Sequence, residues 1–202
     1  MSANLLTNGD FDSGHYHWHN IPEIVIPNGW DFWCEESKSL RIEKQDDPFL
    51  RPETVVWNIK DAPDFEKPLF FLSGNYCLKV FKGWGPIWWR LFQSVSGLTP
   101  GASYRFSAPV FPDLIMGYAA GKKLFANDAL AGEQRLVVRS GTQEFSTPWL
   151  DGKSVPFGKY TPLTLDFTAA ATTAEVTLEV RGRWGLINNG WFVDSLKLEA
   201  LV

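Results

Sequence analysis

The residue types best suited to binding a metal ion gather near the N-terminus. All three histidines of the chain stand at alternate positions, as His15, His17 and His19. On a β-strand, such residues share one face about 7 Å apart, so a neighbouring pair could chelate a transition metal. Three histidines along one straight strand cannot all reach one ion, and no histidine follows His19 to complete a site from another strand.

Paired carboxylates are the second group with catalytic potential. Glycoside hydrolysis needs two carboxyl groups about 5 to 10 Å apart on either side of one bond. The adjacent pairs Glu35, Glu36 and Asp46, Asp47 do not indicate such a site, because neighbours on a strand point to opposite faces. A serine nucleophile in a G-x-S-x-G turn is also absent from the sequence. We therefore name no catalytic residue.

Tryptophan next to arginine is the pattern that most favours ligand binding. The chain has ten tryptophans, and two clusters at 83–90 and 181–185 combine them with arginine and glycine. Indole rings stack on the C–H faces of sugars, and arginine bonds to hydroxyl groups. Contacts of about 1 kcal/mol each give micromolar to millimolar affinity. The predicted ligand-binding residues are Trp33, Trp84, Trp88, Arg90, Arg181, Arg183 and Trp184.

Most of the chain reads as short β-strands that would position these residues. In one segment, Val176, Leu178 and Val180 alternate with polar side chains, which is the period of a half-buried antiparallel strand. Turn formers bound the segments. The clearest predicted strands are 103–111, 135–142, 160–168 and 174–183.

The same alternation assigns each tryptophan of the strand after Pro86 to one of the two faces of that strand. Trp88 and Arg90 share one face, and Trp89 and Leu91 share the other. We expect the second face to be core. The tryptophans assigned to the core are Trp30, Trp89 and Trp191.

Two stretches lack a clear strand pattern. Residues 119–131 form the only helix candidate, but they carry an internal glycine and no apolar stripe, so we expect a loop with one turn of helix. Long loop excursions are expected at about 45–68, around a strand at 54–60, and at 112–133. With no linker and no repeat, the sequence predicts an all-β fold: a single antiparallel β-sandwich over residues 1–202.

Five motifs, in order along the chain, resemble carbohydrate-binding modules with the galactose-binding-like jelly-roll fold. The first, residues 4–14, resembles the family form N-L-L-x-N-G-x-F-E-x-G, with Asp12 where glutamate is usual. Together the motifs span both termini, so the resemblance covers the whole chain. The five motifs are NLLTNGDFDSG (4–14), IPNGW (26–30), SGNYCLKV (73–80), WWRLFQSVSGLTPGASY (88–104) and VDSLKL (193–198).

The resemblance also implies a structural calcium ion where the first and last strands meet. Calcium prefers carboxylate, amide and carbonyl oxygens, and the implied ligands are Asn8, Asp12, Asn75 and Asp194. Asp12 is one methylene shorter than the usual glutamate. The alternative is that Asp12 and Asp194 bond only to turn amides.

A second resemblance concerns the histidines. His17, His19 and Glu23 are similar to the first metal motif of cupins, H-x-H-x3-E, but the further histidine of the cupin site has no counterpart here. In carbohydrate-binding modules this segment is a polar and aromatic loop. That resemblance implies that Tyr16 and Trp18 anchor the loop and leave the histidines partly exposed, with no metal site.

Composition limits the partners and the compartment. The formal net charge of −4, without a basic stripe, argues against nucleic acid, and no segment has the length of a membrane span. Met1 to Leu6 is too short for a secretion signal, so we expect an extracellular or cell-surface protein in a mature or trimmed form, or else a cytoplasmic one. Cys34 and Cys77 are expected to be free thiols.

The leading functional hypothesis is a non-catalytic module that binds an oligo- or polysaccharide, within a larger polypeptide or assembly. Two alternatives stay open. One is a structural or adhesion domain that uses the same aromatic surface against a protein. The other is a jelly-roll polysaccharide lyase with Tyr16, His17 and Arg90 as candidate base and charge neutraliser.

Overall fold

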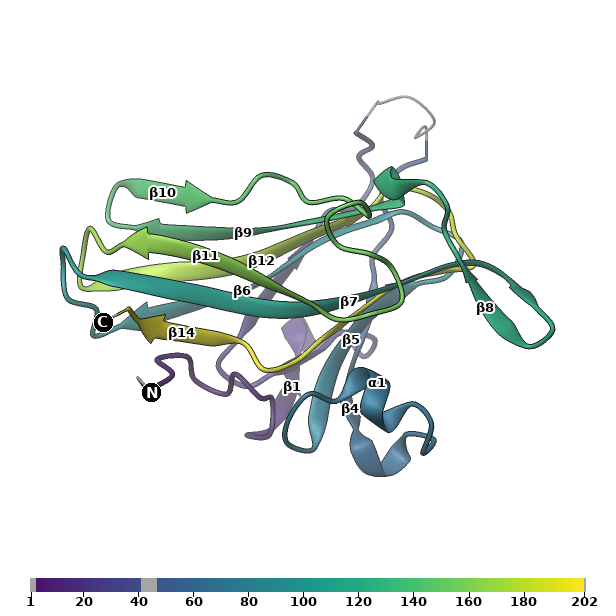
Figure 1. The fold of residues 1–202 in the computed structure, drawn as a ribbon, viewed down its shortest axis with the longest axis horizontal. Coiled ribbons are helices and arrows are strands. Elements are labelled where there is room, and N and C mark those ends of the chain that lie inside the picture. The colour runs from purple at the N-terminus through teal and green to yellow at the C-terminus, as the bar shows by residue number, and fades with distance from the viewer. Residues whose placement is uncertain (1–2, 41–46, 202) are drawn as a thin grey trace.

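The computed structural model describes residues 3–40 and 47–201, and it is an all-β sandwich of two antiparallel sheets (Figure 1). The predicted fold class is therefore confirmed. One sheet has five strands in the order β10-β9-β12-β6-β3. Their bounds are β10 Gln143–Ser146, β9 Gly132–Ser140, β12 Thr173–Gly182, β6 Ile87–Ser96 and β3 Asp31–Cys34.

The second sheet has seven strands. Five follow the order β11-β7-β13-β5-β4, and β8 and β14 also pair with β7. Their bounds are β11 Thr161–Thr168, β7 Ser103–Ala119, β13 Asn188–Val193, β5 Tyr76–Lys82, β4 Glu53–Asn58, β8 Lys122–Phe125 and β14 Lys197–Ala200. The remaining elements are short: β1 His15–His17, β2 Val25–Pro27, α1 Lys67–Phe70 and single 3-10 turns at Trp18–Asn20, Ile59–Asp61 and Ala129–Ala131. Within the described ranges, no helix has the length and apolar character needed to cross a membrane.

The core lies between the sheets and follows the predicted alternation. On β6, Trp89 and Leu91 are fully buried, whereas Trp88 and Arg90 face outward and are only half-buried. Trp30 and Trp191 are also buried, so all three tryptophans assigned to the core are confirmed there. Because the inward positions of β6 are large and apolar, the outward positions are left for polar and aromatic contacts.

The prediction of a long loop at 112–133 is wrong. β7 continues to Ala119 and turns directly into β8, and the two strands form a hairpin that projects from the sandwich (Figure 1). Ala120 and Gly121 both have positive φ, at 49° and 75°, as the two central residues of a type I′ hairpin turn do. Such turns are usually recognised in a sequence by Asn-Gly or Asp-Gly. Ala120 at the first position does not match that pattern, so the hairpin was not predicted.

The other excursion contains the strand expected at 54–60. That strand is β4, which ends at Asn58 because the Asn58 side chain accepts a hydrogen bond from the Lys60 N–H and starts a 3-10 turn. Residues 45 and 46 of this predicted excursion lie outside the described residues.

The two cysteines lie in different sheets. Cys34 ends β3, whereas Cys77 is buried in β5, and both are free thiols as predicted. Burial raises the pKa of Cys34 to about 11, with Glu36 adding to the effect, and burial also raises the pKa of Cys77. Both thiols therefore remain protonated and unreactive at neutral pH.

A small aromatic cluster covers part of the outer side of the seven-stranded sheet. Phe70 of α1 stacks on Phe192 of β13 with ring centroids 3.7 Å apart, and Phe111 of β7 packs edge-on against Phe70 at 5.0 Å. α1 therefore lies over this sheet, beside β4 and β5 in Figure 1. The outer side of the five-stranded sheet carries a different, polar surface.

Candidate functional site

The candidate site is the outer face of the five-stranded sheet. Antiparallel register brings outward side chains of β3, β6, β12, β9 and β10 into rows across the strands. We call these residues, together with Trp149 and Arg183, the outer face. The rows are Trp33, Arg90, Glu179 and Arg135; Trp88, Arg181 and Glu133; Phe92 and Thr177; and Glu175, Arg139 and Glu144.

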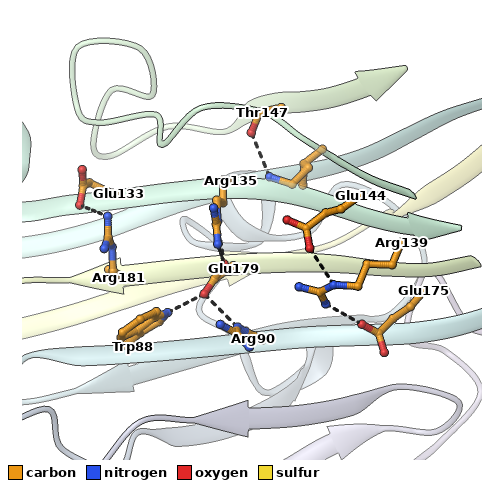
Figure 2. A network of polar contacts seen from close by, with 11 residues as sticks. Trp88, Arg90, Glu133, Arg135, Arg139, Glu144, Thr147, Glu175, Glu179 and Arg181 are labelled. Carbon is orange, nitrogen blue, oxygen red and sulfur yellow. Dashed lines mark hydrogen bonds and ion pairs between the residues drawn. The ribbon is translucent and has the colours of Figure 1, made fainter. Parts of the chain in front are cut away.

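Glu179 occupies the middle of the outer face, and its side chain is only 1% exposed. Its carboxylate accepts hydrogen bonds from Arg90 Nε at 2.9 Å, Arg135 Nε at 2.7 Å and Trp88 Nε1 at 2.8 Å (Figure 2). Burial alone would raise the pKa of Glu179, but the bonds from Arg135 and Arg90 outweigh it and lower that pKa. Glu179 is therefore an ionised carboxylate held by two guanidinium groups.

Glu133 repeats this arrangement at the next row. It accepts a hydrogen bond from Arg181 Nη2 at 2.9 Å and from Arg183 Nε at 2.7 Å. The Arg181 guanidinium lies 3.6 Å from the Trp149 ring centroid and 5.7 Å from that of Trp88, so it is held between two indoles. Burial lowers the pKa of Arg181, with Glu133 acting in the opposite direction.

A pocket of about 150 Å³ opens at the other end of the outer face. Its lining includes Trp33, whose ring centroid lies 4.5 Å from the Arg90 guanidinium. Arg139 bridges Glu144 at 2.9 Å and Glu175 at 3.0 Å (Figure 2). The lining residues are Trp33, Arg90, Phe92, Arg139, Glu175 and Thr177. Aromatic rings, cations, a carboxylate and a hydroxyl in one small hollow suit a ligand with both C–H surfaces and hydroxyl groups.

The structure brings together five of the seven predicted ligand-binding residues. Trp33, Trp88, Arg90, Arg181 and Arg183 all take part in the arginine and tryptophan contacts of the outer face. Their grouping follows from strand register, since they come from β3, β6 and β12, with Arg183 directly after the end of β12.

The other two predicted residues lie in adjoining loops. The Trp84 N–H donates to the Leu186 carbonyl at 2.7 Å, and the Leu186 N–H donates to the Trp184 carbonyl at 2.9 Å. Trp84 is 71% exposed and has a positive φ of 59°. Trp184 instead packs half-buried against the core. The predicted ligand role of these two residues stays a prediction.

Several members of the outer face were missed from sequence. The signal that could have found them is the alternation of charged and apolar residues on 133–139, read against the same alternation on 174–183. Pairing the two strands in register would have matched arginines with glutamates. The missed residues are Phe92, Glu133, Arg135, Arg139, Glu144, Trp149, Glu175, Thr177 and Glu179.

The predicted calcium ligands surround the turn at 72–76. Asp12 Oδ1 accepts from the N–H groups of Asn75 at 2.8 Å and Tyr76 at 3.1 Å, and Asp12 Oδ2 accepts from the Asn75 side-chain amide at 3.0 Å. On the other side, Asp194 Oδ2 accepts from the N–H groups of Leu72 at 2.7 Å and Ser73 at 3.1 Å. These are the turn-amide contacts of the alternative arrangement.

The burial of Asp194 bears on whether a cation could bind at this turn. Asp194 is fully buried, and within the described part of the chain it forms no ion pair with a lysine or arginine. Burial raises its pKa to about 6, against hydrogen bonds from Ser73, Leu72 and Ser195. Asn8 is the least suitable of the four predicted calcium ligands, because its side-chain oxygen already accepts a hydrogen bond from the Ser13 N–H at 2.7 Å. Among the described residues no group of three or more Asp, Glu, His or Cys side chains could hold a metal ion, and Asp12 and Asp194 accept hydrogen bonds from N–H groups, so the calcium ion stays a prediction.

The histidine segment lies at the surface as the short strand β1, which pairs with β2, followed by a 3-10 turn, and not as the expected loop. His15, His17 and His19 are exposed. The Tyr16 hydroxyl donates to the Trp30 carbonyl at 2.9 Å, and Trp18 Nε1 donates to Asp31 at 2.9 Å. The two aromatic residues therefore anchor the segment as predicted.

Comparisons with known proteins bear on the fold. No family model and no curated protein matches the sequence. Among solved structures, the carbohydrate-binding module TmCBM61 in complex with β-1,4-galactotriose has a TM-score of 0.60 at 15% identity, over 99% of this chain and 100% of that one. A cyclase from Fischerella sp. TAU has a TM-score of 0.56 at 14% identity, over 100% of this chain and 98% of that one.

A third solved structure is much longer than this chain. The enzymatically active domain of bacteriophage CBA120 tailspike protein 4 has a TM-score of 0.52 at 10% identity, over 98% of this chain and 21% of that one. The chain thus shares its jelly-roll sandwich with a binding module and with enzymes. At these identities the likeness establishes the fold and leaves the function to be argued from the site.

Proposed function

We propose that this chain is a non-catalytic carbohydrate-binding module that recognises a glycan on the outer face of its five-stranded sheet. The observation that carries the proposal is the pocket of about 150 Å³ beside Trp33 and Phe92, which also contains Arg90, Arg139 and Glu175. Aromatic rings there offer a stacking surface for a sugar. The charged groups around them offer donors and acceptors for its hydroxyls.

Two further points support binding at this face. Apart from Trp149 and Arg183, the side chains of the outer face stand on strands, so their positions are fixed before a ligand arrives. A solved structure with the same fold is described as a complex with β-1,4-galactotriose. That likeness is one of fold, and it supports an oligosaccharide as the first ligand class to test.

The state of the central carboxylate favours binding over hydrolysis. An acid catalyst of glycoside cleavage needs a carboxyl group with a raised pKa. In Glu179, the bonds from Arg90 and Arg135 lower the pKa, so the group stays ionised at neutral pH. Glu133 is likewise bonded to two arginines, Arg181 and Arg183. Both carboxylates are therefore arranged to hold arginines in place.

A glycan array with the soluble protein, followed by calorimetry on the best ligand, tests this proposal. Trp33→Ala should weaken binding about fivefold or more, equivalent to about 1 kcal/mol, while the melting temperature changes little. Phe65→Ala is the matched control, because Phe65 is an aromatic side chain 72% exposed and lies outside the outer face. Equal binding by Trp33→Ala and the parent protein would place the site elsewhere. Failure to retain any glycan would contradict the function.

A further inference from the structure

The outer face carries more guanidinium groups than carboxylates at its buried centre. Glu179 pairs with Arg90 and Arg135, and Glu133 pairs with Arg181 and Arg183. We call these four arginines the arginine cluster. Each buried carboxylate thus faces two cations, which leaves the cluster with two positive charges in excess. This local excess stands out in a chain whose formal net charge is −4.

No further carboxylate forms an ion pair with the arginine cluster in the described part of the chain. The four arginines form ion pairs there only with the two glutamates. Arg181 Nε is buried and has no hydrogen-bond acceptor among the described residues. A buried N–H donor without an acceptor is unfavourable, and so is an excess of one sign of charge, so the cluster is suited to gain from an added anion.

Two members of the cluster remain accessible to a ligand. The side chains of Arg90 and Arg135 are 33% and 26% exposed, whereas that of Arg181 is 13% exposed. Arg90 also lines the pocket. Arg90 bonds to Glu179 through Nε, whereas Arg135 contacts the same carboxylate through both Nε and Nη2. A ligand seated in the pocket would therefore meet guanidinium nitrogens at its edge.

The positions along β12 indicate an extended ligand. Glu175 lies at the pocket and Arg181 at the far row, six residues apart on one strand, which corresponds to about 20 Å. At the pocket end, Arg139 pairs with Glu144 and Glu175. Two carboxylates against one guanidinium leave this group with one negative charge in excess, so the outer face changes from net negative charge around Arg139 to net positive charge at the arginine cluster.

Resting on the proposed function, we propose that the glycan is acidic and that the carboxylate of a uronic-acid residue binds above Glu179, on the guanidinium nitrogens of Arg90 and Arg135 that Glu179 leaves free, next to the pocket. A planar carboxylate offers two oxygens to the fork of a guanidinium group, which makes this pairing stronger than a bond to a neutral hydroxyl. The added charge also balances part of the excess over Glu179 and Glu133.

Calorimetry with trigalacturonate and its methyl ester tests the inference, because the ester keeps the sugar shape and removes the charge. The acid should bind the parent protein at least tenfold more tightly than the ester, and the difference should shrink as salt rises. Arg135→Gln should abolish most of the preference. It leaves Glu179 paired with Arg90, so the variant should fold. Arg105→Gln is the control, because Arg105 pairs with Asp166 on the seven-stranded sheet.

The outcomes separate this inference from the function on which it rests. Equal affinity for acid and ester, or an Arg135→Gln variant that keeps the preference, would overturn the acidic-sugar assignment and leave glycan binding in place. Tighter binding of a sulfated trisaccharide than of the uronate would overturn the choice of a carboxylate. If acid, ester and neutral galactotriose all fail to bind, both proposals are wrong.

Discussion

Replacing Glu179 by glutamine tests whether the outer face is held together by one buried carboxylate. Glutamine keeps the shape of the side chain and removes its charge. The amide has one acceptor oxygen in place of two, so the donors on Arg90, Arg135 and Trp88 cannot all be satisfied. We expect the variant to fold but to lose stability.

The size of the loss follows from burial. Removing one partner of a buried ion pair costs about 3 to 5 kcal/mol. Arg90 and Arg135 keep 33% and 26% of their side chains in water, so part of the cost is relieved by solvent and the low end, about 3 kcal/mol, applies. In a chain of this length, 1 kcal/mol moves the melting temperature by about 2 to 4 °C. The expected decrease is therefore about 6 to 12 °C.

Urea unfolding followed by tryptophan fluorescence provides the assay. With a slope of about 2 kcal/mol per molar urea, the midpoint should fall by about 1.5 M while the slope stays constant. Asp166→Asn is the control, because the Asp166 and Arg105 side chains are 50% and 46% exposed and their pairing is weakened by solvent. A midpoint for Glu179→Gln as high as that of the control would refute the reasoning.

Three further predictions concern titration, metal and thiols. Because the pKa of Glu179 is lowered in the folded state below its ordinary value of 4.5, its stabilising contribution is present above that pH and is lost as pH falls through the lower folded value. Unfolding midpoints measured at decreasing pH should therefore show that the stability difference between the parent protein and Glu179→Gln shrinks below about pH 4.5. A stability difference that stays constant with pH would contradict this. Calcium should raise the melting temperature and EGTA should lower it if Asp12 and Asp194 hold the ion, whereas chelation without effect and no calcium by elemental analysis would refute the site. Mass spectrometry of unfolded, non-reduced, alkylated protein should find Cys34 and Cys77 both labelled, and an unlabelled pair would mean a disulfide.

The sequence predicted strands best where one face is apolar and the other polar. On β6, alternation alone separated Trp89 and Leu91, which are buried, from Trp88 and Arg90, which face outward. That period reflects the pleat of a strand and needs no knowledge of its neighbours. The hairpin after β7 was missed because its turn begins with Ala120, a residue that rarely adopts positive φ.

The outer face was predictable only in part, and the reason is register. Trp33 and Arg90 drew attention by residue type, but the partners that hold them come from strands far along the chain. Glu179 looked like a solvated residue of a half-buried strand, yet its side chain is 1% exposed. Its burial arises because Arg135 on β9 and Arg90 on β6 close over it from both sides. Such a contact depends on strand order, which a single sequence does not specify.

The contacts that fix the arginines also determine how much side-chain entropy is lost when a ligand binds. A free arginine side chain loses about 2 kcal/mol of rotamer entropy when a ligand immobilises it. In the outer face, Arg181 is already held between Trp88 and Trp149, and Arg135 is held by Glu179 and Trp149, so folding has absorbed that loss. The ordering cost of association therefore falls mainly on the ligand's own glycosidic torsions. A conformationally stiff chain should then bind more tightly than a flexible one with the same groups.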